Sequence, residues 1–397
     1  MGESVAARGE EEIRQPGRLN RPGFVELYFD LVYVVALVVL GQRLVGHLTW
    51  LGVGQTLILF LAFAVIWMLT AWVPDTFNAD RARIQVQIIW VMIGILVMCR
   101  AVSGAFEGRG PLFAIAYLSV HLGASTYLRL SATGADVRSR MSRILFWFCV
   151  SGPLWLVGAF TAADHRTALW GGAILLEYTA AALGWPAPKL GRSAVREWRL
   201  EAERVSERYR QLLIVAFGVV IFVSGLMLSR GSHTLDRFGA FVVMFATTAL
   251  MWRTYTHRAG TLLSQAFAAS FNASRFGQFA GIAHLIMVAG VLAEAVTAQL
   301  LIAHPVGGTS APRGAVILGG PVLFLIGRGL LDYLVFSRVS WSRPGALILL
   351  AALAPAVELL PPIAVGGLAA VILLGVAIVN VAAIRRHPPM AAPPTVR

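Results

Sequence analysis

Two acidic residues, Glu26 and Asp30, stand four residues apart in the apolar stretch FVELYFDLVYVVAL, residues 24–37. In an α-helix this spacing places both carboxylates on one face, about 40° apart around the axis, and Tyr33 continues the same stripe. Carboxylates so close oppose each other's ionisation, which is typical of proton or cation sites. We therefore predict a proton-binding or catalytic role for Glu26 and Asp30, with Tyr33 and Tyr28 as substrate contacts. The alternative is that both carboxylates only fix helix packing through hydrogen bonds.

Glu177, in AILLEYTAA, is a third candidate because it lies mid-way along an apolar segment with no basic residue beside it. Acids inside membrane segments are costly and usually face the interior of the helix bundle. By contrast, we expect Glu294 and Glu358 to reach water, because both lie near the ends of their apolar segments. His121 and His284 are each a candidate for carrying a proton or for a helix-to-helix hydrogen bond, and His121 is also a candidate substrate contact.

Arg328 and Asp332 also stand four residues apart within an apolar segment. An internal ion pair would make both charges tolerable there. The alternative is that Arg328 binds an anionic substrate or neutralises the acids of residues 24–37. We count both as candidate substrate-binding residues.

Several kinds of site are not expected. The sequence has no H-x-x-x-H, HExxH or clustered Cys/His spacing, so we predict no metal and no cofactor. It has no GxxxxGK[ST] motif, so we do not expect an ATPase. The net charge of +13 comes from arginines at the ends of apolar runs, which indicates membrane topology rather than nucleic-acid binding.

The elements that must position these residues are membrane-spanning helices. Of 397 residues, 57% are hydrophobic and 13% are charged, about half the charged share of a soluble protein. Apolar runs long enough to cross a bilayer recur along the chain. We predict an all-α polytopic integral membrane bundle of about twelve transmembrane helices, at 24–46, 50–72, 83–104, 111–130, 143–161, 166–185, 209–229, 237–257, 276–301, 314–336, 344–361 and 363–383.

Arginine placement predicts the orientation of these spans. Arginines concentrate on the side that holds the N-terminus if twelve spans are correct, which predicts both termini in the cytoplasm. The predicted divisions are a polar N-terminal tail (1–23), a first membrane half (24–185), a basic linker (186–208), a second membrane half (209–383) and a C-terminal tail (384–397).

The two halves show signs of an internal repeat. FVELYFDLVYVVAL aligns with VSERYRQLLIVAFG, and Gly110-Pro111 and Pro153 have counterparts in Gly320-Pro321 and Pro355. Six spans is an even number, so each half would begin on the same side of the membrane. The two halves would then have the same orientation in the membrane, as in the parallel 6+6 repeats of transporters.

The opening motif FVELYFDLVYVVAL resembles that of the bacterial low temperature requirement A family. The resemblance continues through TFNADRARIQVQIIWVMIGILVMCRAVSGAFEGRGPLFAIAYLSVHLG and AILLEYTAAALGWPAPKLGRS, and covers residues 20 to 385. The resemblance implies a polytopic protein of the bacterial inner membrane, in a family named for growth in the cold. It does not imply a biochemical activity.

This chain departs from the family pattern in its second half. Where the family usually has an intramembrane Glu, this chain has Val219, and where it often has an acid after the eighth span, this chain has His257. Arg204 replaces a usual His. Glu26, Asp30 and Glu177 are kept.

Three functions fit these features. We favour a proton-coupled secondary transporter of a small or amphipathic substrate, with the lipid bilayer as its environment and no nucleic-acid partner. The alternative is an integral-membrane enzyme on a lipophilic substrate, such as a cyclase or isomerase that starts an isoprenoid cyclisation with a carboxylic acid. The third is a cold-stress membrane protein without turnover.

Overall fold

The computed structural model describes residues 23–77, 81–132, 134–193, 202–230 and 234–386. Within these ranges the regular structure is helical, and the one bridge between extended segments pairs Ala187 with Gly191. The predicted all-α class is thus confirmed. Most of the predicted N-terminal and C-terminal tails and part of the basic linker lie outside the described residues.

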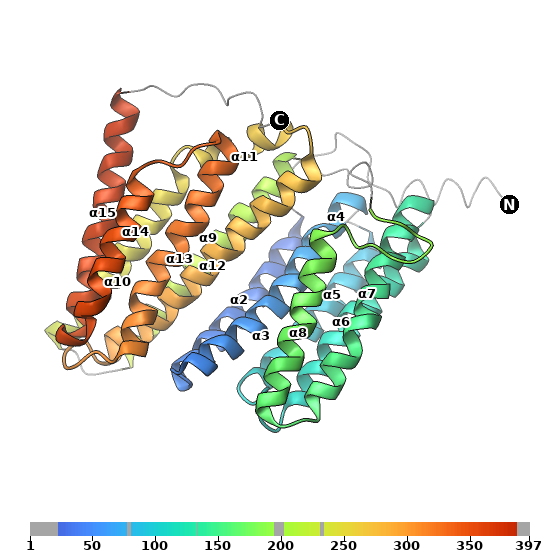
Figure 1. Cartoon of the computed structure of the whole chain (residues 1–397), viewed down its shortest axis with the longest axis horizontal. Helices are drawn as coiled ribbons and strands as arrows, with labels where there is room; N and C mark the ends of the chain where they lie inside the picture. The colour runs from blue at the N-terminus through green and yellow to red at the C-terminus, as the bar shows by residue number, and fades with distance from the viewer. Residues whose placement is uncertain (1–22, 78–80, 133, 194–201, 231–233, 387–397) are drawn as a thin grey trace. The chain divides into compact units, whose positions relative to one another are not determined.

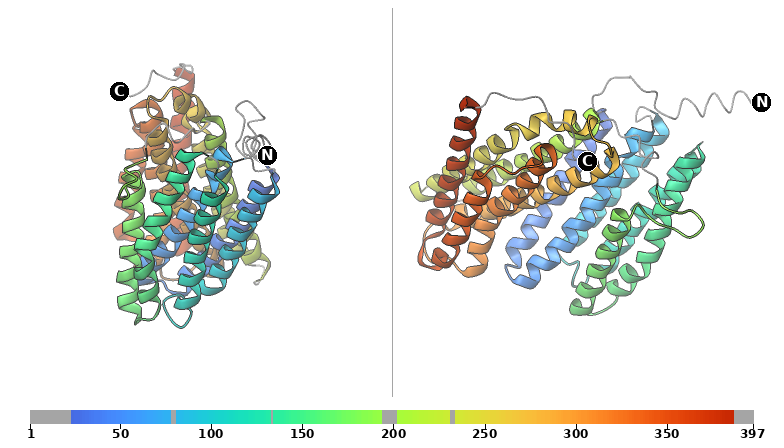
Figure 2. Two further views of the ribbon diagram at one scale, coloured as in Figure 1. Left: turned by 90° about the vertical axis from the view of Figure 1, so that its right-hand side faces the viewer. Right: turned by 45° about the horizontal axis from the view of Figure 1, so that its top comes forward.

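The chain forms two compact units. Unit 1 comprises the chain up to Arg43 together with Gly54–Val205. Within it α5, α6, α7 and α8 pack in sequence order, each against the next, and the long helices run alongside one another (Figures 1 and 2). Its helices are α2 Phe24–Gly46, α3 Trp50–Ala71, α4 Val73–Thr76, α5 Ala82–Val102, α6 Gly110–Ser131, α7 Ala135–Ala159 and α8 Ala163–Ala182.

Unit 2 comprises Leu44–Val53 and the chain from Ser206 onwards. Its central helix is α12, which packs against α10, α11, α13 and α15. The outer helices α14 and α15 lie side by side (Figure 1). Its helices are α9 Ala202–Ser229, which begins in unit 1, α10 Leu235–Thr256, α11 Ala259–Ala268, α12 Ala273–Ala303, α13 Ala311–Phe336, α14 Ser342–Leu353, η2 Ala354–Leu359 and α15 Pro362–Arg386.

Eleven of the described helical segments are long and apolar enough to span a membrane. The remaining predicted span, 166–185, corresponds to α8, whose 20 residues would cover about 30 Å at 1.5 Å per residue. Its first turn carries the polar residues Asp164, His165 and Arg166, and α8 is not among those eleven segments. The predicted span 344–361 is α14 followed by η2, where Pro355 interrupts the α-helix.

The helices are apolar on their outer faces as well as inside. In α5, Ile88 and Ile95 are buried, yet Trp90, Ile93 and Leu96 on other faces are about half exposed. A water-soluble bundle would carry polar residues at such positions. The exposed apolar face therefore requires lipid around it, and the lipid bilayer is the environment of this protein.

Candidate functional site

Glu177 lies inside unit 1 and accepts three hydrogen bonds from neutral side chains. Tyr117 Oη donates to Oε2 at 2.5 Å, and Ser151 Oγ and Trp155 Nε1 donate to Oε1 at 2.7 and 2.9 Å. The side chain is 1% exposed. No arginine, lysine or histidine forms an ion pair with it among the described residues.

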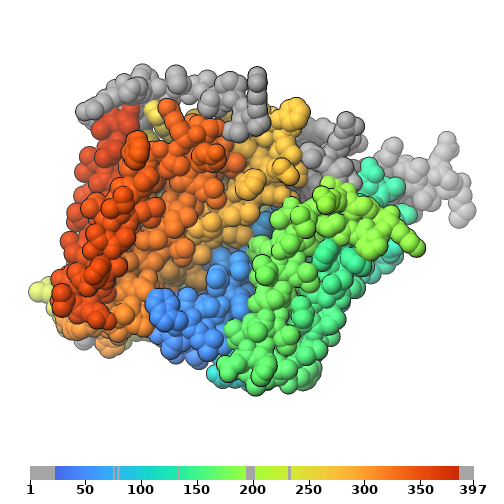
Figure 3. Space-filling model, in the orientation of Figure 1, coloured from blue at the N-terminus to red at the C-terminus, as the bar shows by residue number. Residues whose placement is uncertain are grey.

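Helical spacing brings these donors to Glu177. Ser151 and Trp155 are four residues apart on α7, and the buried residues of α8 include Arg166, Trp170, Ala173 and Glu177, which are three or four residues apart. The two stripes face each other because α7 and α8 pack as neighbours. Figure 3 shows α8 covering one face of unit 1 beside α7.

Arg166 anchors the start of α8. Its guanidinium donates to the carbonyls of Gly158, Ala159 and Thr161 at 2.9–3.0 Å, where α7 ends. It also donates to Ala105 O and Glu107 O in the connection between α5 and α6. The last carbonyls of a helix lack partners of their own, so one arginine satisfies them and sets the level of α8 along α7.

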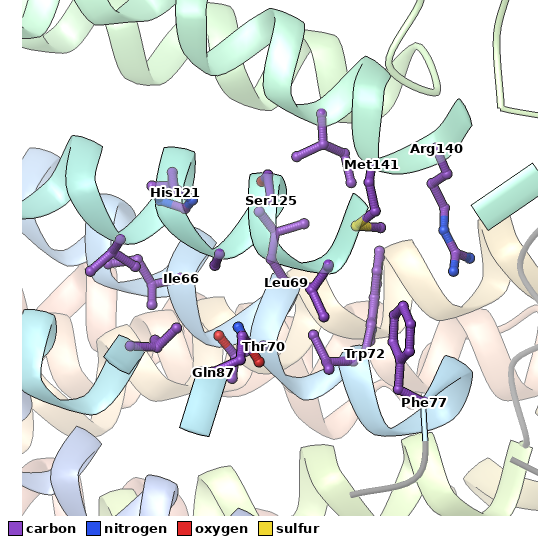
Figure 4. A pocket seen from close by; sticks show the side chains of 16 residues that line it. Ile66, Leu69, Thr70, Trp72, Phe77, Gln87, His121, Ser125, Arg140 and Met141 are labelled. Atoms are coloured by element: carbon purple, nitrogen blue, oxygen red, sulfur yellow. The ribbon is translucent and has the colours of Figure 1, made fainter. Parts of the chain in front are cut away.

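A pocket lies near this acid, between α3, α5, α6 and α7. It contains about 580 Å³ of space not filled by atoms, part of it open to the surroundings. Its wall is mostly apolar, and its polar lining residues are Thr70, Gln87, His121, Ser125 and Arg140. His121 and Arg140 lie toward opposite ends (Figure 4). Gln87 Oε1 and His121 Nε2 are buried without a hydrogen-bond partner among the described residues.

His121 connects the pocket to Glu177 through Tyr117. Its ring stacks on Phe148 with the centroids 3.8 Å apart, and the Tyr117 ring contacts it edge-on at 4.5 Å. Tyr117 and His121 are one turn apart on α6. The order from pocket to acid is therefore His121, Tyr117, Glu177.

The donor set around Glu177 suits a carboxyl that changes protonation state. When Glu177 is ionised, all three neighbours donate to it, which offsets part of the cost of a buried charge. When it is protonated on Oε2, the same short contact to Tyr117 is kept with Glu177 as the donor, since a phenol oxygen also accepts. Both states thus keep their hydrogen bonds without moving heavy atoms.

The carboxylates of the opening motif are buried in unit 1, as their shared stripe predicts, but do not line this pocket. Glu26 forms an ion pair with Arg204 and accepts from Gly23 N at 3.1 Å. Asp30 accepts from Trp67 Nε1 at 3.0 Å. Arg204 therefore supplies a positive counter-charge to Glu26.

The two tyrosines of the motif differ in environment. Tyr33 is fully buried, and its hydroxyl has no hydrogen-bond partner among the described residues. Tyr28 is 58% exposed, on the outer face of α2. A contact between Tyr28 and a substrate would therefore occur at the surface rather than in the interior.

The remaining predicted residues lie in unit 2. Arg328 and Asp332 form the buried ion pair expected from their spacing, and Arg343 Nε lies 3.0 Å from Asp332 Oδ2. His284 donates through Nδ1 to Ala280 O at 2.7 Å, so its Nε2 accepts from Tyr255 Oη at 3.1 Å. This is the helix-to-helix hydrogen bond that was one of its two predicted roles.

Glu294 corrects a prediction. It was expected to reach water near the end of its span, but it is 2% exposed. The reason is the length of α12, which runs nine residues beyond Glu294 to Ala303, and the close packing of α13 against it.

Sequence reasoning missed the partners of Glu177. Tyr117, Ser151 and Trp155 are separated from it by 60, 26 and 22 residues, so no local spacing links them to the acid. The sequence feature that could have indicated them is a spacing of four residues, which places Tyr117 with His121, and Ser151 with Trp155, on one face of a helix. Among the described residues, no group of three His, Cys, Asp or Glu side chains could hold a metal ion.

These features define a polytopic helical membrane protein with a buried acid that Tyr117 and His121 connect to a partly open pocket. The chain matches, over residues 21–378, the family described as bacterial low temperature requirement A protein (LtrA), and it belongs to that family. It is also similar to an uncharacterized protein, RA0937, of Rhizobium meliloti (strain 1021), at 29% identity over 364 residues, 90% of this chain and 88% of that protein. No solved structure matches it.

Proposed function

We propose that this protein is a proton-coupled secondary transporter in which Glu177 binds the proton and the pocket of unit 1 binds the substrate. The observation that carries the proposal is Glu177 itself, a buried carboxyl held by three neutral donors and separated from the pocket by His121 and Tyr117. Its hydrogen bonds are compatible with both protonation states, as coupling requires. The absence of an ATPase motif agrees with secondary transport.

The pocket supports a small amphipathic substrate. Most of its wall is apolar, and two of its polar atoms, the acceptor Gln87 Oε1 and the ring nitrogen His121 Nε2, have no hydrogen-bond partner among the described residues. An apolar body with a hydroxyl or amide N–H that donates to Gln87 would fit both features. The arginine distribution supports a location in the cell membrane with both termini in the cytoplasm.

The test compares wild type with Glu177→Gln in liposomes that contain a pH-sensitive dye. Amphipathic candidates with hydroxyl or amide groups are added outside, and mass spectrometry follows substrate and products in the same samples. We expect substrate-dependent proton movement in wild type and its loss in Glu177→Gln, because the amide cannot release a proton. Glu203→Gln, which changes an exposed acid in the same way, should retain flux.

Two results would contradict the proposal. Proton-coupled flux that survives in Glu177→Gln would remove Glu177 from the mechanism. A new lipid-soluble product in wild type, without proton movement, would instead support the integral-membrane enzyme.

Tyr117→Phe should lower the proton-coupled flux about 10- to 100-fold while leaving the protein folded. The substitution keeps the ring between His121 and Glu177 and removes the hydroxyl that bonds Oε2. Losing a hydrogen bond to a charged group costs about 1.5–3 kcal/mol, and about 1.4 kcal/mol corresponds to a factor of ten in rate. The flux is measured in the liposome assay at matched protein content. Tyr178→Phe, which removes the hydroxyl bond to Leu61 O, is the matched control and should change flux little.

A further inference from the structure

Glu294 is a carboxyl group buried in unit 2 without a counter-charge. The side chain is 2% exposed, and its Oε2 atom has no hydrogen-bond partner among the described residues. It also forms no ion pair within the described part of the chain. This differs from Glu26 and Asp332, the buried acids that pair with arginine.

The backbones of α12 and α13 approach closely around Glu294. A Cβ atom added at Gly320 on α13 would lie 2.7 Å from Glu294 Oε2. A Cβ atom added at Gly290 on α12 would lie 2.7 Å from Gly320 O. The carboxyl group is thus confined between two helices, and its oxygen lies against the backbone of α13. Glycine at these positions makes room for it.

Titratable groups near Glu294 do not neutralise it. On α13, Arg313 and Arg328 lie about 10 and 12 Å along the helix from Gly320, at about 1.5 Å per residue. None of the titratable side chains on α12 and on the unit 2 segments around it forms a hydrogen bond or ion pair with Glu294 among the described residues. They are Arg275 and His284 on α12, Asp236, Arg237, Arg253 and Tyr255 on α10, Arg313, Arg328, Asp332 and Tyr333 on α13, Glu207, Arg208, Tyr209 and Arg210 on the unit 2 part of α9, and His47 and His304 in loops.

We infer that Glu294 is a second proton-binding site, in unit 2, distinct from Glu177. An ionised carboxylate without a partner in this environment is strongly disfavoured, so the resting form is the neutral acid. The O–H of a neutral carboxyl group needs a hydrogen-bond acceptor. On α13 the carbonyl of Ile317, one helical turn before Gly320, is available as an acceptor. Pro321 has no N–H to donate to the carbonyl of Ile317, four residues before it. The inference does not rest on the proposed transport function.

Infrared spectroscopy of the purified full chain in lipid tests this site directly. A protonated carboxyl has its own C=O stretching band, which shifts when the exchangeable proton is replaced by deuterium. We expect a band at neutral pH that is missing in Glu294→Gln and present in Glu177→Gln. The Glu294 band should disappear reversibly as the pH is raised, at pH values where circular dichroism shows that the protein is still folded.

Three results would overturn the inference. An identical carboxyl band in wild type and Glu294→Gln would mean that Glu294 is ionised. A Glu294 band that persists until alkaline unfolding would mean a permanently neutral structural acid. Loss of the band on adding NaCl, but not KCl at equal ionic strength, would mean a sodium site. If Glu294→Gln does not fold, Glu294→Asp replaces it, and a displaced band is then the expected result.

Discussion

Asp332→Asn is expected to destabilise unit 2 by about 3–5 kcal/mol, the usual cost of removing one partner of a buried ion pair. Asp332 is 5% exposed and faces two buried arginines, Arg328 on its own helix and Arg343 on α14. Asparagine has nearly the same shape but carries no charge. The variant would therefore leave two guanidinium groups in a poorly hydrated interior without a neutralising carboxylate.

The hydrogen bonds of the arginines make this cost hard to avoid. Arg328 donates to Thr254 O at 3.0 Å and to His257 O, and so joins α13 to the end of α10. Arg343 donates to Asn380 Oδ1 at 2.6 Å and so joins α14 to α15. Neither side chain can turn toward water without breaking these contacts between helices.

The measurement is the free energy of unfolding of detergent-solubilised protein, followed by circular dichroism. Glu207→Gln is the matched control, because the Glu207–Arg210 pair at 2.7 Å is about one-third exposed and should contribute at most about 1 kcal/mol. Arg343→Met in the Asp332→Asn background should recover part of the loss by removing one excess charge. A double variant less stable than Asp332→Asn would contradict the electrostatic explanation.

Gly290→Ala is expected to cost about 1–3 kcal/mol, although it adds a single methyl group. The new Cβ would lie 2.7 Å from Gly320 O and 2.7 Å from Phe324 N, both backbone atoms of α13. Backbone atoms in a helix cannot turn aside as a side chain can. The two helices must therefore separate, and the packing between α12 and α13 is lost along the contact.

Gly218→Ala in α9 provides the comparison. A Cβ at Gly218 meets nothing within 4 Å, so this change should be neutral or stabilising, because alanine favours helix by about 1 kcal/mol over glycine. Both variants are compared by thermal unfolding in the same detergent. Equal stability of Gly290→Ala and wild type would show that α12 and α13 do not need their close approach.

Local properties of the sequence determined the class of this protein. Hydrophobic runs of bilayer length and few charged residues predicted a polytopic α-helical membrane protein, because a backbone in lipid must satisfy its own hydrogen bonds. The motif FVELYFDLVYVVAL identified the family, and the spacing of Arg328 and Asp332 predicted their ion pair. Each of these depends on residues within one helix or on composition.

The tertiary structure decided which acids have a counter-charge. Glu26 and Glu177 are both acids in apolar helices, yet Glu26 meets Arg204, 178 residues away, and Glu177 meets a tyrosine, a serine and a tryptophan. Glu294 was expected to reach water but lies against Gly320. Helix packing brings residues distant in sequence together, and an apolar helix face can pack in many ways, so helical spacing alone does not specify these partners.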